Sequence, residues 1–72
     1  MDISKARRLM ELGVVVVAVK HDKAKEFVGK IVHIVEPKDY APPPYTPDFK
    51  MKVEDENGKR HFFWSGEVKV KR

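Results

Sequence analysis

The side chains on which most enzyme chemistry depends are scarce in this chain. It contains no cysteine, so a thiolate nucleophile is excluded. The two serines, Ser4 and Ser65, stand in no pattern typical of an activated nucleophile. The glycines form no phosphate-binding loop of the kind that nucleotide-dependent enzymes use. We therefore expect no catalytic residues, no enzyme activity and no small-molecule substrate.

Three histidines, His21, His33 and His61, are the remaining candidates for metal ligation. They fall in different predicted elements and share no ligand-like spacing, whereas a zinc site needs three or four converging ligands. His33 lies within an apolar strand pattern, which favours a place in the wall of the sheet. The lack of cysteine also removes most structural zinc arrangements. The sequence predicts neither a metal nor any other cofactor.

Basic residues outnumber acidic ones and gather in three clusters, within residues 5–8, 50–52 and 69–72. The chain has 15 lysines and arginines against 11 acids, a formal net charge of +4 and a pI of about 9.5. This balance favours contact with nucleic-acid phosphates, although an ordinary solvated surface accounts for it equally well. The candidate nucleic-acid-binding residues are Lys5, Arg7, Arg8, Lys50, Lys52, His61, Phe63, Lys69, Lys71 and Arg72.

All five prolines lie between residues 37 and 47. Proline excludes a helix or a central strand there, so a proline-rich loop is predicted over residues 37–48. Its run of three prolines followed by tyrosine fits the pattern that WW domains bind; it also fits a rigid loop held by aromatic packing. The candidate protein-binding residues are Tyr40, Pro42, Pro43, Pro44 and Tyr45.

One helix is expected to precede the strands. Asp2 is a suitable N-cap and Gly13 a suitable left-handed C-cap, which predicts a helix over residues 1–12. Its apolar side should pack on the rest of the domain, and its basic side should be exposed. The apolar residues are Ile3, Ala6, Leu9 and Met10.

Several short strands follow the helix. Residues 13–20 are rich in β-branched side chains, which favour strands because their χ1 rotamers are stiff. Residues 27–36 predict a second strand, in which Gly29 marks a bulge or a close backbone approach. A last short strand is expected over residues 67–71, where valine alternates with charge.

The clearest local signal is Asn57-Gly58, which is typical of a two-residue hairpin turn. The turn joins predicted strands at 49–56 and 59–65. Pairing across it separates an apolar face from a charged face, as a half-buried hairpin requires. The apolar face has Phe49, Met51 and Val53 opposite Phe62 and Trp64; the other has Lys50, Lys52, Glu54 and Glu56 opposite Ser65, Phe63, His61 and Lys59.

This register gives two aromatic residues different roles. Trp64 is predicted to be a core residue. Phe63 is predicted to lie on the outer face across from Lys52, where an aromatic ring among cations suits base stacking beside phosphate contacts. The alternative is that the helix or the proline-rich loop covers Phe63.

Size and composition predict a single domain over residues 1–72. A hydrophobic content of 42% with 36% charged residues indicates a globule rather than a disordered tail or a membrane protein. The longest uncharged apolar run, 13–19, is too short to span a bilayer, and no signal-peptide pattern is present. A small domain without cysteine favours a reducing compartment, so a cytoplasmic location is expected.

Residues 14–35 resemble the KOW motif of SH3-like barrels, which occurs in transcription-elongation and ribosomal proteins. The matching positions are Val17 and Val19 before a basic turn and the glycine-led strand from Gly29 to Ile34. The turn departs from the motif, because His21, Asp22, Ala24 and Glu26 stand where KOW proteins usually have glycines. The resemblance implies a platform for nucleic acid or protein partners.

The expected fold is therefore mostly β: a small, SH3-like, partly open antiparallel barrel of four to five strands (residues 13–72) after one N-terminal α-helix. The expected function is a non-enzymatic binding module that associates with nucleic acid or with a nucleoprotein complex such as the transcription or translation machinery. The alternative is a protein–protein adaptor or inhibitor that acts on a host complex. One form of this hypothesis is that a phage encodes the protein. No membrane partner is expected.

Overall fold

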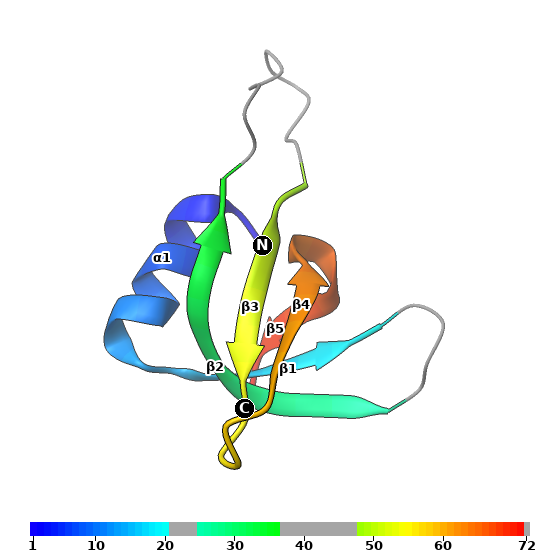
Figure 1. Cartoon of the computed structure of the whole chain (residues 1–72). Helices are drawn as coiled ribbons and strands as arrows, with labels where there is room; N and C mark the ends of the chain where they lie inside the picture. The colour runs from blue at the N-terminus through cyan, green and yellow to red at the C-terminus, as the bar shows by residue number, and fades with distance from the viewer. Residues whose placement is uncertain (21–24, 37–47, 72) are drawn as a thin grey trace.

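A computed structural model describes residues 1–20, 25–36 and 48–71. Five antiparallel strands form one open sheet in the order β4-β3-β2-β1-β5, with a single helix before them (Figure 1). The elements are α1 (Ile3–Leu12), β1 (Val15–Val19), β2 (Glu26–Val35), β3 (Lys50–Glu54), β4 (Arg60–Trp64), the 3-10 turn η1 (Ser65–Glu67) and β5 (Val68–Val70). The predicted fold class, mostly β with one N-terminal helix, is confirmed. Six of the predicted site residues lie outside the described residues: Tyr40, Pro42, Pro43, Pro44, Tyr45 and Arg72.

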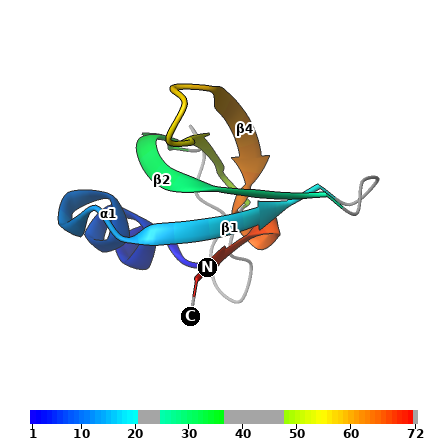
Figure 2. The same cartoon turned by 90° about the horizontal axis from the view of Figure 1, so that it is seen from below.

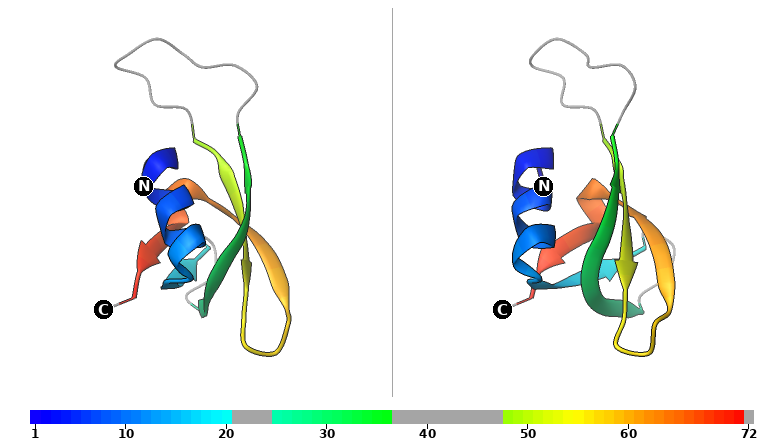
Figure 3. Two further views of the ribbon diagram at one scale, coloured as in Figure 1. Left: turned by 90° about the vertical axis from the view of Figure 1, so that its left-hand side faces the viewer. Right: turned by 60° about the vertical axis from the view of Figure 1, so that its left-hand side comes forward.

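The helix α1 begins and ends at the predicted caps. The Asp2 carboxylate accepts a hydrogen bond from the backbone N–H of Lys5 at 2.7 Å, which satisfies one free donor of the first turn. Gly13 ends the helix in the left-handed conformation, with φ at 66°. Ala6 and Leu9 are buried against the sheet. The helix packs against β2, and it lies on the side of the molecule away from the tip of the β3–β4 hairpin (Figure 3).

The long strand β2 bends, and the bend shapes the sheet. Its first half pairs with β1, and its second half, from Lys30 onward, pairs with β3. The register shifts between Ile31 and His33, so Val32 is an extra residue of a β-bulge. Figure 2 shows β2 following β1 and then turning toward β4. At the bend, Gly29 lies against the backbone of Glu54, which confirms the close approach predicted there.

The hairpin forms where predicted, but the prediction of a two-residue turn is wrong. The backbone N–H of Asp55 donates to the Lys59 carbonyl at 2.9 Å, and the N–H of Gly58 donates to the Asp55 carbonyl at 3.1 Å. A type I′ turn requires positive φ at both central residues. Gly58 has a φ of 83°, whereas no non-glycine residue of the described chain has a positive φ, and this includes Asn57. The loop therefore holds three residues, with glycine in the left-handed position.

The extra loop residue moves the register of β4 by one and reverses every side chain on it. Met51 now lies opposite Phe63. Phe63 is buried, with 4% of its surface exposed, while Phe62 and Trp64 face solvent with 47% and 46% exposed. The core placement of Trp64 and the outward placement of Phe63 are thus both wrong. The buried apolar residues are Ala6, Leu9, Val16, Ala18, Ile31, Phe49, Met51, Val53, Phe63 and Val68.

Candidate nucleic-acid interface

The side of β3 and β4 that faces away from the core carries three cross-strand pairs. Met51 and Val53 are buried, so strand alternation turns the residues between and beside them outward. The pairs are Lys50 with Trp64, Lys52 with Phe62, and Glu54 with Arg60. Two of the three pairs therefore combine a lysine with an aromatic ring.

The lysines lie over the rings that they face. The Lys50 Nζ is 4.9 Å from the centroid of the Trp64 ring, and the Lys52 Nζ is 4.9 Å from that of Phe62. At exposed sites such cation–π contacts contribute about 0.5–1 kcal/mol. The contact holds each ring beside a positive charge and leaves ring surface open to solvent, which the exposed fractions near one half show.

The second half of β2 extends this surface. His33 lies opposite Lys52, and Val35 lies opposite Lys50, so both share the side of the two aromatic rings. Val32 and Val35 are each 42% exposed. We call this surface the outer face; it comprises Val32, His33, Val35, Lys50, Lys52, Phe62 and Trp64.

Charge is unevenly distributed along the outer side of the hairpin. Near the turn, Arg60 Nε lies 3.1 Å from the Glu54 carboxylate, so this cation is matched by an acid. Lys50 and Lys52, farther from the turn, have aromatic neighbours instead. Lys50 and Lys52 therefore lie at the end that carries Phe62 and Trp64, where the Glu67 carboxylate also accepts a hydrogen bond from the backbone N–H of Trp64 at 2.8 Å.

Of the ten predicted nucleic-acid-binding residues, Lys50 and Lys52 lie together on the outer face. His61 and Phe63 do not, because the corrected register turns them to the inner side of β4. Phe62 and Trp64 were missed as surface residues for the same reason. The signal that could have found them is Asp55, whose carboxylate accepts from the backbone N–H groups of Asn57 and Lys59, both at 2.9 Å, and so stabilises the longer turn.

The other predicted basic residues lie elsewhere. The Arg7 guanidinium forms an ion pair with the Glu36 carboxylate. Lys5 and Lys69 line a shared surface hollow beside the N-terminus. Arg8 and Lys71 are also exposed, Arg8 on the helix and Lys71 after β5. Arg7 lies close to the outer face, because its partner Glu36 directly follows Val35, whereas β5, which precedes Lys71 and contains Lys69, is the opposite edge strand of the sheet from β4.

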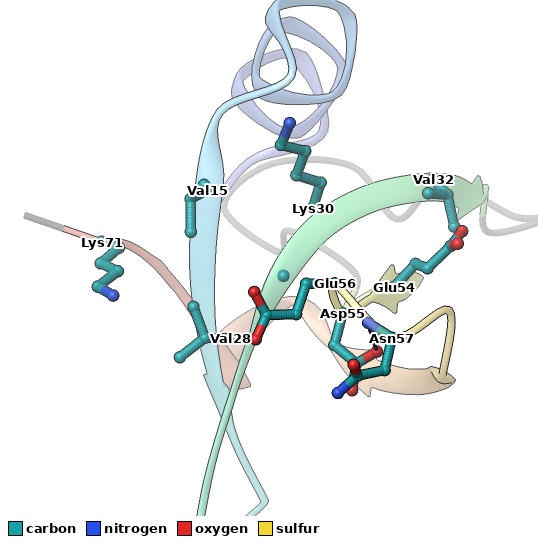
Figure 4. Close-up of a pocket in the computed structure, with 10 residues that line it drawn as sticks. Val15, Val28, Lys30, Val32, Glu54, Asp55, Glu56, Asn57 and Lys71 are labelled. Carbon is teal, nitrogen blue, oxygen red and sulfur yellow. Dashed lines mark hydrogen bonds between the residues drawn. The ribbon is translucent and has the colours of Figure 1, made fainter.

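The largest hollow described, about 750 Å³, lies where β2 bends (Figure 4). Val15 and Val28 contribute apolar lining, and Lys71 approaches from the side of β5. The hairpin contributes three carboxylates, and these repel a phosphate group. The carboxylates belong to Glu54, Asp55 and Glu56. This hollow is therefore a poorer match to nucleic acid than the outer face.

Within the described ranges, no group of three or more histidine and acidic side chains is placed to hold a metal ion. The ten-residue α1 is too short to cross a bilayer, and no other helix of the described chain is long and apolar enough to do so. Compared with protein-family models, curated proteins and solved structures, the chain matches none of them.

Proposed function

We propose that this chain is a non-enzymatic binding module that contacts single-stranded nucleic acid through the outer face, alone or within a nucleoprotein complex. One observation carries the proposal. Two half-exposed aromatic rings, Phe62 and Trp64, stand side by side on one strand, each with a lysine ammonium 4.9 Å from its centroid. Ring faces stack on bases, and the lysines neutralise the phosphates that follow those bases.

The spacing of the rings favours a single strand over a duplex. Phe62 and Trp64 are two residues apart on β4, so they are separated by about 6.7 Å along the strand. Bases in a duplex follow one another at about 3.4 Å on each strand. Only a strand whose bases are free to splay apart can present one base to each ring.

The free edge of the sheet supports a second candidate, the protein–protein adaptor. β4 is an edge strand of the described sheet: it pairs with β3 on one side, and no strand of the described residues pairs with its other side. An extended peptide could pair with its backbone by strand addition. Val32 and Val35 would add apolar contacts of a kind that a protein partner uses.

The test uses Trp64, the single tryptophan of the chain, as its reporter. Stacking of a base on Trp64 quenches its fluorescence, and anisotropy of labelled oligonucleotides gives the affinity. We expect saturable quenching and tighter binding of single-stranded than of double-stranded DNA or RNA. Phe62→Ala and Trp64→Ala should each weaken single-strand binding by roughly fivefold or more, since one stacked base contributes about 1–3 kcal/mol.

Leu12→Ala is the matched control, because Leu12 is 69% exposed and lies at the end of α1, away from β4. It should leave the affinity unchanged. No binding at about 50 mM salt, where phosphate contacts are strong, would leave the adaptor as the better account. Duplex affinity equal to single-strand affinity would also contradict the proposal.

A further inference from the structure

A second aromatic surface lies on the inner side of the edge strand β4. Here a hollow of about 400 Å³ lies between the paired strands β1 and β2 and the β3–β4 hairpin. Phe27 comes from β2, while His61 and Phe63 come from β4. Because alternate residues of β4 point to opposite faces, this hollow and the outer face lie on either side of one edge strand.

The rings in the hollow have a defined geometry. Phe27 meets His61 edge-to-face, with centroids 5.1 Å apart and an interplanar angle of 84°. It meets Phe63 at 5.5 Å with a tilt of 39°. Phe63 is buried, Phe27 is half-buried and His61 is exposed. The hollow thus has an apolar floor and an exposed imidazole at its rim, on which a planar ligand can stack.

The charges around the hollow favour an anionic ligand. Three lysines line it, and the Lys20 Nζ is 5.8 Å from the centroid of the Phe63 ring. Two carboxylates, Glu26 and Asp55, also line it. The Asp55 carboxylate is already engaged by the two backbone N–H groups of the hairpin loop. The lysines are Lys20, Lys25 and Lys59.

We propose that this hollow binds a nucleobase together with its attached phosphate. The base would stack on the exposed His61 imidazole and meet the nearly perpendicular Phe27 ring edge-on, and the phosphate would lie among the lysines. The nucleotide has two possible sources: a free nucleotide, or a unit of a single strand that passes over the β4 edge from the outer face. The second source rests on the function proposed above.

The test is an NMR titration of the backbone amides of the ¹⁵N-labelled full chain with AMP, adenosine and inorganic phosphate. AMP should shift the amides of Phe27, Lys59 and His61 in a saturable manner and more strongly than adenosine or phosphate does. His61→Ala should weaken AMP binding by about fivefold or more, the loss expected of one stacking contact. Lys59→Gln should weaken AMP but not adenosine. Both side chains are exposed, so neither change empties the core.

Leu12→Ala is the matched control, because Leu12 is exposed at the end of α1, lines neither the hollow nor the outer face, and should leave AMP binding unchanged. AMP shifts confined to the amides of Phe62 and Trp64, or no greater than those with adenosine, would overturn this inference without touching the proposed function. Loss of oligonucleotide affinity in His61→Ala would identify the strand as the source, whereas retained oligonucleotide affinity together with weakened AMP binding would identify the free nucleotide.

Discussion

Gly29 lies directly against the backbone of Glu54, where β2 crosses from its pairing with β1 to its pairing with β3. A β-carbon at position 29 would stand 2.2 Å from the Glu54 carbonyl oxygen and 2.7 Å from its carbonyl carbon. Non-bonded atoms cannot approach so closely, and the obstacle is backbone rather than a flexible side chain. The bend in β2 that places the outer face therefore depends on the absence of a β-carbon at Gly29.

Gly29→Ala should consequently destabilise the domain, by about 2 kcal/mol or more, because β2 and the end of β3 must move apart. Urea unfolding monitored by circular dichroism measures the loss. Gly66→Ala is the matched control, since a β-carbon there would have no neighbour within 4 Å. Equal stability of the two variants would contradict the close packing at Gly29.

The corrected register of β4 predicts opposite effects for adjacent phenylalanines. Phe63→Ala removes a ring that is 4% exposed and should cost about 3–5 kcal/mol, enough to unfold a domain of this size. Phe62→Ala removes a ring that is 47% exposed and should cost about 1 kcal/mol or less, mostly its contact with Lys52. Thermal unfolding of the two variants decides between the registers, because the reverse order of stabilities would restore the two-residue turn.

The three-residue hairpin loop predicts a purely conformational effect at Gly58. Its φ is 83°, and a β-carbon there would meet no atom within 4 Å. Gly58→Val should therefore cost more than about 1 kcal/mol through backbone strain alone. Gly58→Asn should cost less, since asparagine tolerates the left-handed region. Denaturant titration of both variants measures the difference, and equal losses would argue against strain as the cause.

The sequence was a good guide to the helix and to the existence of the hairpin, because both depend on local signals. Asp2 and Gly13 satisfy the ends of α1 through bonds within a few residues. The register of β4 could not be read in the same way. Phe62, Phe63 and Trp64 are consecutive aromatic residues, so alternation fits either face. The Asp55 side chain and the loop length decide between them.

The candidate sites also differ in whether local sequence signals could predict them. Lys50 and Lys52 were identified because they alternate with the buried Met51 and Val53 on a clear strand pattern. The inner hollow could not be predicted, because Phe27 and His61 are brought together by the path of β2 and lie far apart in the sequence. Such long-range contacts have no signature in a single sequence without a reference fold.

The proposed interface makes a quantitative prediction for salt dependence. Lys50 and Lys52 are the lysines of the outer face, so if each neutralises one phosphate, the logarithm of the single-strand binding constant should fall with log salt at a slope of roughly −1.4. Lys50→Gln combined with Lys52→Gln removes both of these contacts and should bring the slope close to zero. Anisotropy titrations at several salt concentrations measure it, with binding that is micromolar or weaker near physiological salt.

Lys5→Gln combined with Lys69→Gln is the matched control. Each double variant removes two positive charges from the formal net charge of +4, so the long-range field of the protein falls equally in both. Lys5 and Lys69 line a hollow with Met1, Val68 and Val70, and none of these residues belongs to the outer face. The control should therefore keep the wild-type slope. If both pairs reduced the slope alike, the protein would attract nucleic acid through its net charge, and the outer face would have no special part in binding.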